Sequence, residues 1–253
     1  MGYLIAIAGK GGTGKTTLAA LLVRLIRENK IGSVLAVDAD PNSNLAEALG
    51  VKPRQTIGAI LDKIARDPSK IPAGMPKERF IEYEVQTAVE EAEGFDILTM
   101  GRPEGPGCYC YVNNVLRNIM AKLIGDYDYI VIDNEAGLEH LSRRTTRSAD
   151  ALLVISDATP VGLKAAKRMM ALVKELEIKT KKNLLIINRA TLKDKYRAGK
   201  NREKVIGASI DFLGYIPYDS RINRASINGN SIMQLKNNAP SLAALGKLKD
   251  KIL

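Results

Sequence analysis

The residues with the clearest chemistry lie near the N-terminus, where residues 9–16 read GKGGTGKT and directly follow an apolar run. This spacing fits the pattern G-x-x-x-x-G-K-[ST], in which glycines let backbone N–H groups and the positive end of the next helix approach phosphate oxygens. We expect Lys15 to hold the β- and γ-phosphates of a nucleotide and Thr16 to bind Mg²⁺. The residues predicted to contact the nucleotide here are Gly9, Lys10, Gly11, Gly12, Thr13, Gly14, Lys15, Thr16 and Thr17.

Two cysteines, Cys108 and Cys110, form a second candidate site in a segment rich in glycine and proline, before a helix expected to start near Asn113. They are too close in sequence to act as an ordinary structural disulfide, which gains by closing longer loops. Two thiolates one residue apart can chelate a soft or borderline metal ion, but they supply only half of a four-coordinate shell. The alternative is a pair of inert thiols in a loop.

Two acidic residues, Asp38 and Asp40, follow another apolar run. Ligands of parallel sheets bind at the carboxyl ends of the strands, so these two carboxylates are expected at a ligand-binding edge of the sheet. Asp40 has a second reading, in which its side chain caps a helix that starts near Ser43. Both roles are compatible.

The elements that position these residues alternate along the chain. Short, almost continuously apolar runs are separated by helical stretches, which is typical of strands covered on both faces in a parallel sheet. We therefore predict an α/β fold with a doubly wound, mostly parallel sheet flanked by helices, as in P-loop NTPases, and with helices over Thr16–Arg27 and Val161–Leu176. No repeat or linker interrupts residues 1–253, which are predicted to form a single domain. The predicted strands are Tyr3–Ala8, Ser33–Val37, Phe95–Met100, Tyr129–Ile132, Ala151–Ile155, Asn183–Ile187 and Phe212–Ile216.

Composition limits the class of protein. The 253 residues are 45% hydrophobic, and no apolar run approaches the roughly 20 residues of a transmembrane helix. The chain enters a strand-like run without a basic leader, so we expect a cytoplasmic location. The net charge is +10, with a basic excess in Lys179–Lys204 and an acidic excess in Glu78–Asp96. Such blocks are usually solvated helix faces and less often docking surfaces for an acidic partner or nucleic acid.

The second lysine of the phosphate loop, Lys10, resembles the deviant Walker A signature of the MinD/ParA family. In that family two subunits sandwich two nucleotides, and the lysine matching Lys10 reaches the phosphates of the partner. The resemblance implies a homodimer that hydrolyses ATP to ADP and phosphate with Mg²⁺. It assigns catalytic roles to Lys10, Lys15 and Asp40, of which Asp40 orients or activates the attacking water, and it places Asp38 near the magnesium shell.

Two later segments also resemble this family. The stretch from Asp133 to Gly137 is similar to its switch II, in which the aspartate binds Mg²⁺ and a glycine N–H faces the γ-phosphate. Asn188 and Arg189 resemble a strand end whose asparagine reads adenine, although the family often has lysine in place of Arg189. The resemblance therefore implies adenine rather than guanine as the base.

The cysteine pair, together with residues 135–145, resembles the CooC-type ATPases, which mature the nickel enzymes carbon monoxide dehydrogenase and acetyl-CoA synthase. The resemblance implies that Cys108 and Cys110 of both subunits bind Ni²⁺ at the two-fold axis, where Zn²⁺ could also bind, and that the partner is a nickel-enzyme client. His140 could be a further nickel ligand, but a lone histidine is more often a packed or switch-coupling residue.

Other classes explain less of the sequence. Nitrogenase-reductase-like proteins take their cluster cysteines from two separate loops, and iron–sulfur scaffolds typically carry C-x-x-C. A ParA-like protein would place Lys179–Lys204 on DNA phosphates, which leaves the cysteines unexplained. A MinD-like protein would place Ser241–Leu253 on a membrane, whereas we expect this segment to be a terminal helix packed on the sheet. We therefore expect neither nucleic acid nor a membrane as the partner.

Overall fold

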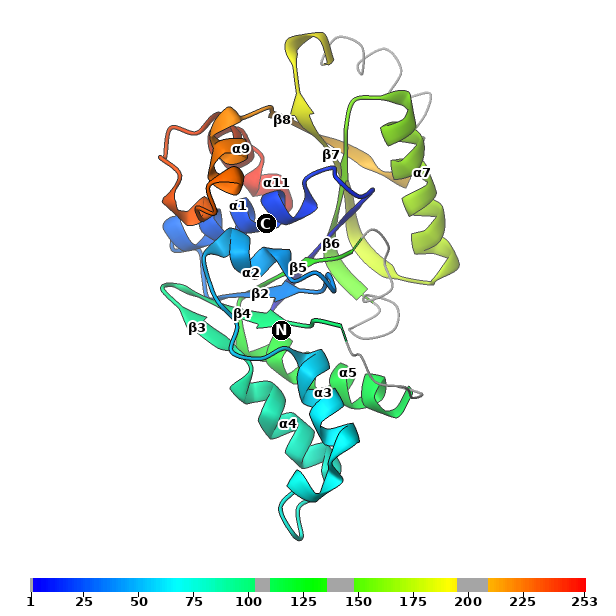
Figure 1. Ribbon diagram of the computed structural model, residues 1–253. Helices are drawn as coiled ribbons and strands as arrows, with labels where there is room; N and C mark the ends of the chain where they lie inside the picture. The colour runs from blue at the N-terminus through cyan, green and yellow to red at the C-terminus, as the bar shows by residue number, and fades with distance from the viewer. Residues whose placement is uncertain (1, 103–109, 136–147, 195–208) are drawn as a thin grey trace.

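The computed structural model describes residues 2–102, 110–135, 148–194 and 209–253 (Figure 1). The described strands are β1 (Tyr3–Gly9), β2 (Val34–Asp38), β3 (Glu90–Ala92), β4 (Phe95–Thr99), β5 (Tyr129–Asp133), β6 (Ser148–Ser156), β7 (Lys179–Ala190) and β8 (Asp211–Pro217). They form one sheet in the order β3-β4-β2-β5-β1-β6-β7-β8. Only β3 runs antiparallel to its neighbour, which confirms the predicted mostly parallel, doubly wound α/β fold.

All seven predicted strands are present. The edge strand β3 was missed, because its three residues read Glu-Glu-Ala and carry no apolar run. In β1, Leu4, Ala6 and Ala8 pack into the core on one side of the sheet, while Ile5 and Ile7 pack into the core on the other side. Both faces of the central strands are therefore buried, which is why their sequences are continuously apolar.

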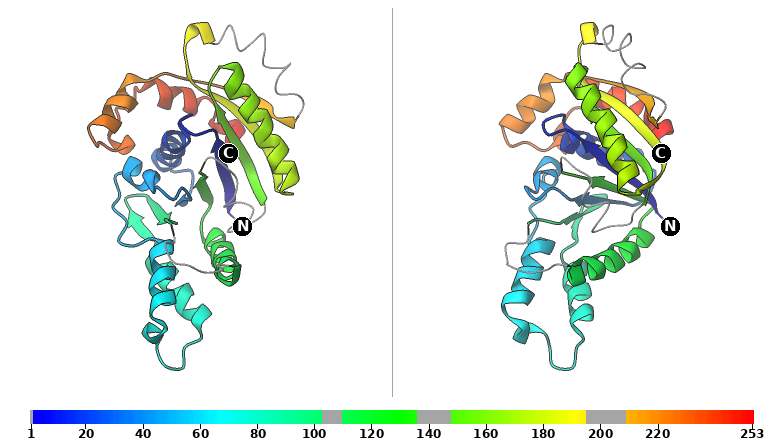
Figure 2. Two further views of the ribbon diagram at one scale, coloured as in Figure 1. Left: turned by 45° about the vertical axis from the view of Figure 1, so that its right-hand side comes forward. Right: turned by 90° about the vertical axis from the view of Figure 1, so that its right-hand side faces the viewer.

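Helices cover both faces of the sheet (Figure 2). One face is covered by α1 (Lys15–Glu28), α2 (Asn44–Leu49), α9 (Ser220–Ile227), η3 (Ile232–Gln234), α10 (Pro240–Gly246) and α11 (Lys249–Ile252). The other face is covered by α3 (Ile57–Arg66), α4 (Lys77–Thr87), α5 (Cys110–Asp126) and α7 (Pro160–Glu175), with the short η1 (Pro68–Lys70) joining α3 toward α4. The predicted helices over 16–27 and 161–176 correspond to α1 and α7.

The C-terminal segment packs into the protein, as expected. Leu242 and Leu245 of α10 and Ile252 of α11 are buried in the same core as α1. These apolar side chains are therefore buried in the protein core and are not available to insert into a membrane. Within the described residues, no helix is both long and apolar enough to cross a membrane.

Most of the described part of the basic block at 179–204 is a strand rather than a helix face; only residues 192–194 are helical. Its first half is β7, which begins at Lys179 and lies between β6 and β8. The start of α5 also differs from the expectation, because the helix begins at Cys110 rather than near Asn113. Cys110 is thus the first residue of a helix, not part of the loop.

Candidate nucleotide site

The predicted site residues converge because parallel strands end at the same edge of the sheet. The register places Asp38 of β2 beside Asp133 of β5, and Asp133 beside Ile7 of β1. The loop after β1 carries the phosphate-loop glycines and leads directly into α1. Residues separated by about 120 positions in sequence therefore surround one location, at the carboxyl edge where α/β sheets bind ligands.

The two lysines of the phosphate loop point to different environments. Lys15, the first residue of α1, is 8% exposed, whereas Lys10 is exposed to solvent. The loop between them is closed by Thr13, whose backbone N–H and hydroxyl both donate to the carbonyl of Lys10, at 3.3 and 2.8 Å. The geometry suits an inner role for Lys15 toward a bound phosphate and an outward role for Lys10.

Gly14 is required by the backbone of this loop. Its φ is +91°, and a Cβ added there would lie 2.4 Å from Nδ2 of Asn188. That amide donates a 2.8 Å hydrogen bond to the carbonyl of Thr13, so it cannot move away freely. The end of β7 is thereby fixed against the phosphate loop.

Gly14→Ala is therefore expected to destabilise the nucleotide-free protein by about 1–3 kcal/mol, through backbone strain and the clash with Asn188. Gly11→Ala is the matched control, because a Cβ at Gly11 meets nothing within 4 Å. Its free energy of unfolding should stay within about 0.5 kcal/mol of the parent. Urea unfolding of both variants checks this, and equal losses would contradict it.

Asp38 is fully buried and caps α2. Its Oδ2 accepts hydrogen bonds from the N–H groups of Leu45 (2.8 Å) and Ala46 (3.3 Å). Burial raises the pKa of Asp38 to about 6, although these backbone donors oppose the rise. The capping role considered for Asp40 thus belongs to Asp38, while Asp40 accepts from the backbone and side-chain N–H groups of Asn42, both at 2.9 Å.

Asp133 is the least satisfied carboxylate of the site. It is fully buried, and neither carboxylate oxygen has a hydrogen-bond partner among the described residues. Burial, together with the charges of Asp38 and Asp40, raises the pKa of Asp133 to about 7. The nearby Thr16 hydroxyl and Lys15 ammonium oppose the rise without satisfying the carboxylate. A buried carboxylate beside a threonine hydroxyl fits Mg²⁺, which prefers oxygen ligands and would offset the desolvation.

The raised pKa of Asp133 has a consequence for stability in the absence of Mg²⁺. A carboxyl group whose pKa is higher in the folded chain binds its proton more tightly when folded, so its charged form destabilises the fold as pH rises from about 4 through about 7. Asp133→Asn should therefore raise the free energy of unfolding by about 1–3 kcal/mol at pH 8.

This gain should shrink as pH falls toward 5, where the parent carboxyl group is protonated. Urea unfolding at pH 5 and pH 8 in EDTA measures the difference between the variant and the parent. A gain that does not depend on pH would contradict the assignment of the raised pKa to Asp133.

A pocket of about 160 Å³ adjoins the phosphate loop and was not predicted as a whole. Asn188 and Arg189, which were predicted to contact the base, line it together with Tyr218, Ile222 and Ser226 from the end of β8 and from α9. Nη1 of Arg189 donates to the carbonyl of Gly12 at 3.2 Å. The sequence could have indicated this pocket, because the predicted strands that became β7 and β8 end beside it.

Two predicted site residues, Cys108 and Gly137, lie outside the described residues, and so does His140. Cys110 is placed by its backbone, at the start of α5. The chain that leads toward the cysteines leaves β4 next to the acidic site, because the N–H of Met100 donates to the carbonyl of Asp38 at 2.8 Å.

Comparisons with known proteins agree with this geometry. The family described as "CobQ/CobB/MinD/ParA nucleotide binding domain" matches residues 4–232. An uncharacterized ATP-binding protein of Methanocaldococcus jannaschii is 41% identical over 99% of this chain and 98% of that protein. The carbon monoxide dehydrogenase accessory protein CooC of Rhodospirillum rubrum is 32% identical over 91% of this chain and 89% of that protein. The structure of the cell division ATPase MinD of Pyrococcus furiosus superposes with a TM-score of 0.71 at 23% identity, covering 100% of this chain and 98% of that chain.

Proposed function

Because the chain belongs to the CobQ/CobB/MinD/ParA family of nucleotide-binding domains, we propose that it is a homodimeric, Mg²⁺-dependent ATPase of the CooC type. It binds nickel through Cys108 and Cys110 of both subunits and inserts the metal into the cluster of carbon monoxide dehydrogenase or acetyl-CoA synthase. The observation that carries the proposal is the C-x-C pair in a chain similar to CooC along most of its length.

The nucleotide chemistry rests on the geometry of the phosphate loop. Lys15 faces inward, where its ammonium holds the β- and γ-phosphates, and Thr16 and Asp133 hold Mg²⁺, which neutralises charge on the phosphates when bound. Asp40 is partly exposed and can orient the attacking water. Lys10 faces solvent, which suits a cation that reaches the nucleotide of the second subunit and stabilises charge on the transferred phosphoryl group.

The metal chemistry rests on the place of the cysteines in the chain. They follow β4, and the residues just after β4 are tied on both sides: Met100 donates to Asp38, and Gly58 at the start of α3 donates to the carbonyl of Met100, also at 2.8 Å. A shift of the segment around Asp38 on ATP binding or hydrolysis would thus be transmitted to the start of the cysteine segment. Two thiolates from each subunit complete the four-coordinate shell that one subunit lacks.

Nickel titration of the metal-free protein tests this proposal, with native mass spectrometry and metal analysis read together, with and without ATP. We expect one nickel ion per dimer in the parent and none in Cys108→Ser/Cys110→Ser. The double variant should still hydrolyse ATP, because it leaves Lys10, Lys15 and Asp40 unchanged.

A double variant that binds nickel as tightly as the parent would overturn the metal site. The protein would then be an ATPase of the wider MinD/ParA type, acting on DNA or at a membrane surface. If the parent binds zinc but not nickel, the proposed cysteine metal site stands, and the proposal that its metal is nickel is contradicted.

A further inference from the structure

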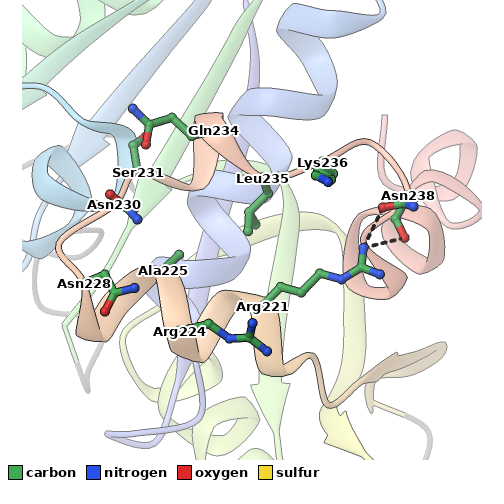
Figure 3. Close-up of a pocket in the computed structure, with 10 residues that line it drawn as sticks. All are labelled: Arg221, Arg224, Ala225, Asn228, Asn230, Ser231, Gln234, Leu235, Lys236 and Asn238. Atoms are coloured by element: carbon green, nitrogen blue, oxygen red, sulfur yellow. Dashed lines mark hydrogen bonds between the residues drawn. The ribbon is translucent and has the colours of Figure 1, made fainter.

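A second cavity, of about 520 Å³, lies between α9 and the segment 228–238 (Figure 3). Three cations line it: Arg221 and Arg224 from α9, and Lys236 from the opposite wall. Amide and hydroxyl side chains from Asn230, Ser231 and Gln234 complete much of the lining, and the described lining contains no carboxylate. The volume is in the range of pockets that hold small molecules.

Among the described residues, none forms an ion pair with the cations of this cavity. The side chains of Arg224 and Lys236 make no hydrogen bond or ion pair with any residue that the structure describes. Arg221 is held by neutral groups only, since its Nη1 donates to the backbone carbonyl (3.0 Å) and to Oδ1 (2.6 Å) of Asn238. Guanidinium groups pair with phosphate oxygens through parallel N–H bonds, so the cavity suits a ligand that carries phosphates.

The wall opposite α9 is held in place by the helix that follows the phosphate loop. Arg24 of α1 is 1% exposed and donates to the carbonyl of Ile232 at 2.8 Å and to Oδ1 of Asn237 at 2.7 Å. At the start of α9, Asp219 accepts from the N–H of Arg221 at 3.0 Å and from the hydroxyl of Ser241 at 2.9 Å. Both walls of the cavity are thus fixed by hydrogen bonds to other parts of the protein.

Helix α9 separates this cavity from the pocket next to Asn188. Ile222 and Ser226 line the pocket on one side of the helix, and Arg221 and Arg224 line the cavity on the other. A ligand that draws the two arginines toward itself would therefore act on the same helix that lines the pocket next to Asn188.

We propose that this cavity binds a small molecule with two or more phosphate groups and that its occupancy changes the affinity for nucleotide through α9. The site goes beyond the proposed function, because it requires neither nickel nor the cysteines. By linkage, nucleotide must change the affinity for the phosphorylated ligand by the same factor.

Isothermal titration tests the proposal with fructose 1,6-bisphosphate as the probe, on protein saturated with ADP so that the phosphate loop is filled. We expect saturable binding to the parent, weakened at least about tenfold in Arg224→Gln/Lys236→Gln, since each charged contact contributes a substantial part of the affinity. Arg168→Gln is the matched control, because Arg168 is exposed on α7 across the sheet and should leave binding unchanged. The affinity for ADP should depend on the probe in the parent and not in the double variant.

Three results would overturn the proposal. They are no saturable binding to the parent, equal binding to the parent and the double variant, and an affinity for ADP that does not respond to the probe. Retention of duplex DNA by the parent but not by the double variant, with no binding of the bisphosphate, would assign the cations to nucleic acid instead. None of these results bears on nickel binding, so the two proposals fail separately.

Discussion

Lys10→Ala is expected to lower the rate of ATP hydrolysis by roughly 10³-fold, the scale of effect of a cation supplied by a partner in P-loop enzymes, while ADP still binds. The physical reason is the position of Lys10. It is exposed in the single chain, at the mouth of the phosphate loop, whereas Lys15 is buried and already available to the nucleotide of its own subunit. A steady-state phosphate-release assay with saturating ATP measures the change, and Lys52→Ala, at an exposed position away from the site, is the control.

Mixing variants separates a role in the partner from a role in the same subunit. A Lys10→Ala subunit lacks the outward cation but retains Asp40. An Asp40→Ala subunit lacks the carboxylate but retains Lys10. If Lys10 acts across the interface, mixed dimers contain one complete site and hydrolysis returns on mixing the two inactive proteins. Absence of any recovery, with mixed dimers detected by native mass spectrometry, would place Lys10 in its own subunit's site.

Lys15→Ala is expected to weaken binding of ADP with Mg²⁺ by about 3 kcal/mol, or roughly 10²-fold, because it removes a desolvated cation from the phosphates. The effect should be larger for ATP, because the γ-phosphate is also expected to contact this ammonium. Lys15 in addition lowers the pKa of Asp133, so its loss should push that pKa further up. Isothermal titration with ADP measures the affinity, and Lys10→Ala is the matched control within the same loop.

An affinity for ADP in Lys15→Ala equal to that of the parent would contradict the placement of the phosphates. Lys15→Met guards against a purely structural explanation, because it keeps the length of the buried side chain and removes only the charge. Both variants should lose affinity to a similar extent if the charge is responsible. Urea unfolding of each variant confirms that the fold persists.

The sequence by itself determined the nucleotide-binding family and the class of fold. The glycine and lysine spacing at 9–16 identifies the phosphate loop, and each run predicted as a strand is a strand, because backbone preference and burial of both faces act within a few residues. The position of Asp38 at a ligand-binding strand end could also be expected, since parallel sheets bind ligands at the carboxyl ends of their strands.

Only the tertiary structure decided which side chains form hydrogen bonds with one another. Asp38 rather than Asp40 caps α2, and Asn188 bonds Thr13, 175 positions away in sequence, because the strand order brings the end of β7 against the phosphate loop. The cationic cavity behind α9 depends on Arg24 holding Ile232, across 208 positions. Such contacts depend on how strands are ordered and how helices pack, and a local pattern of residue types encodes neither.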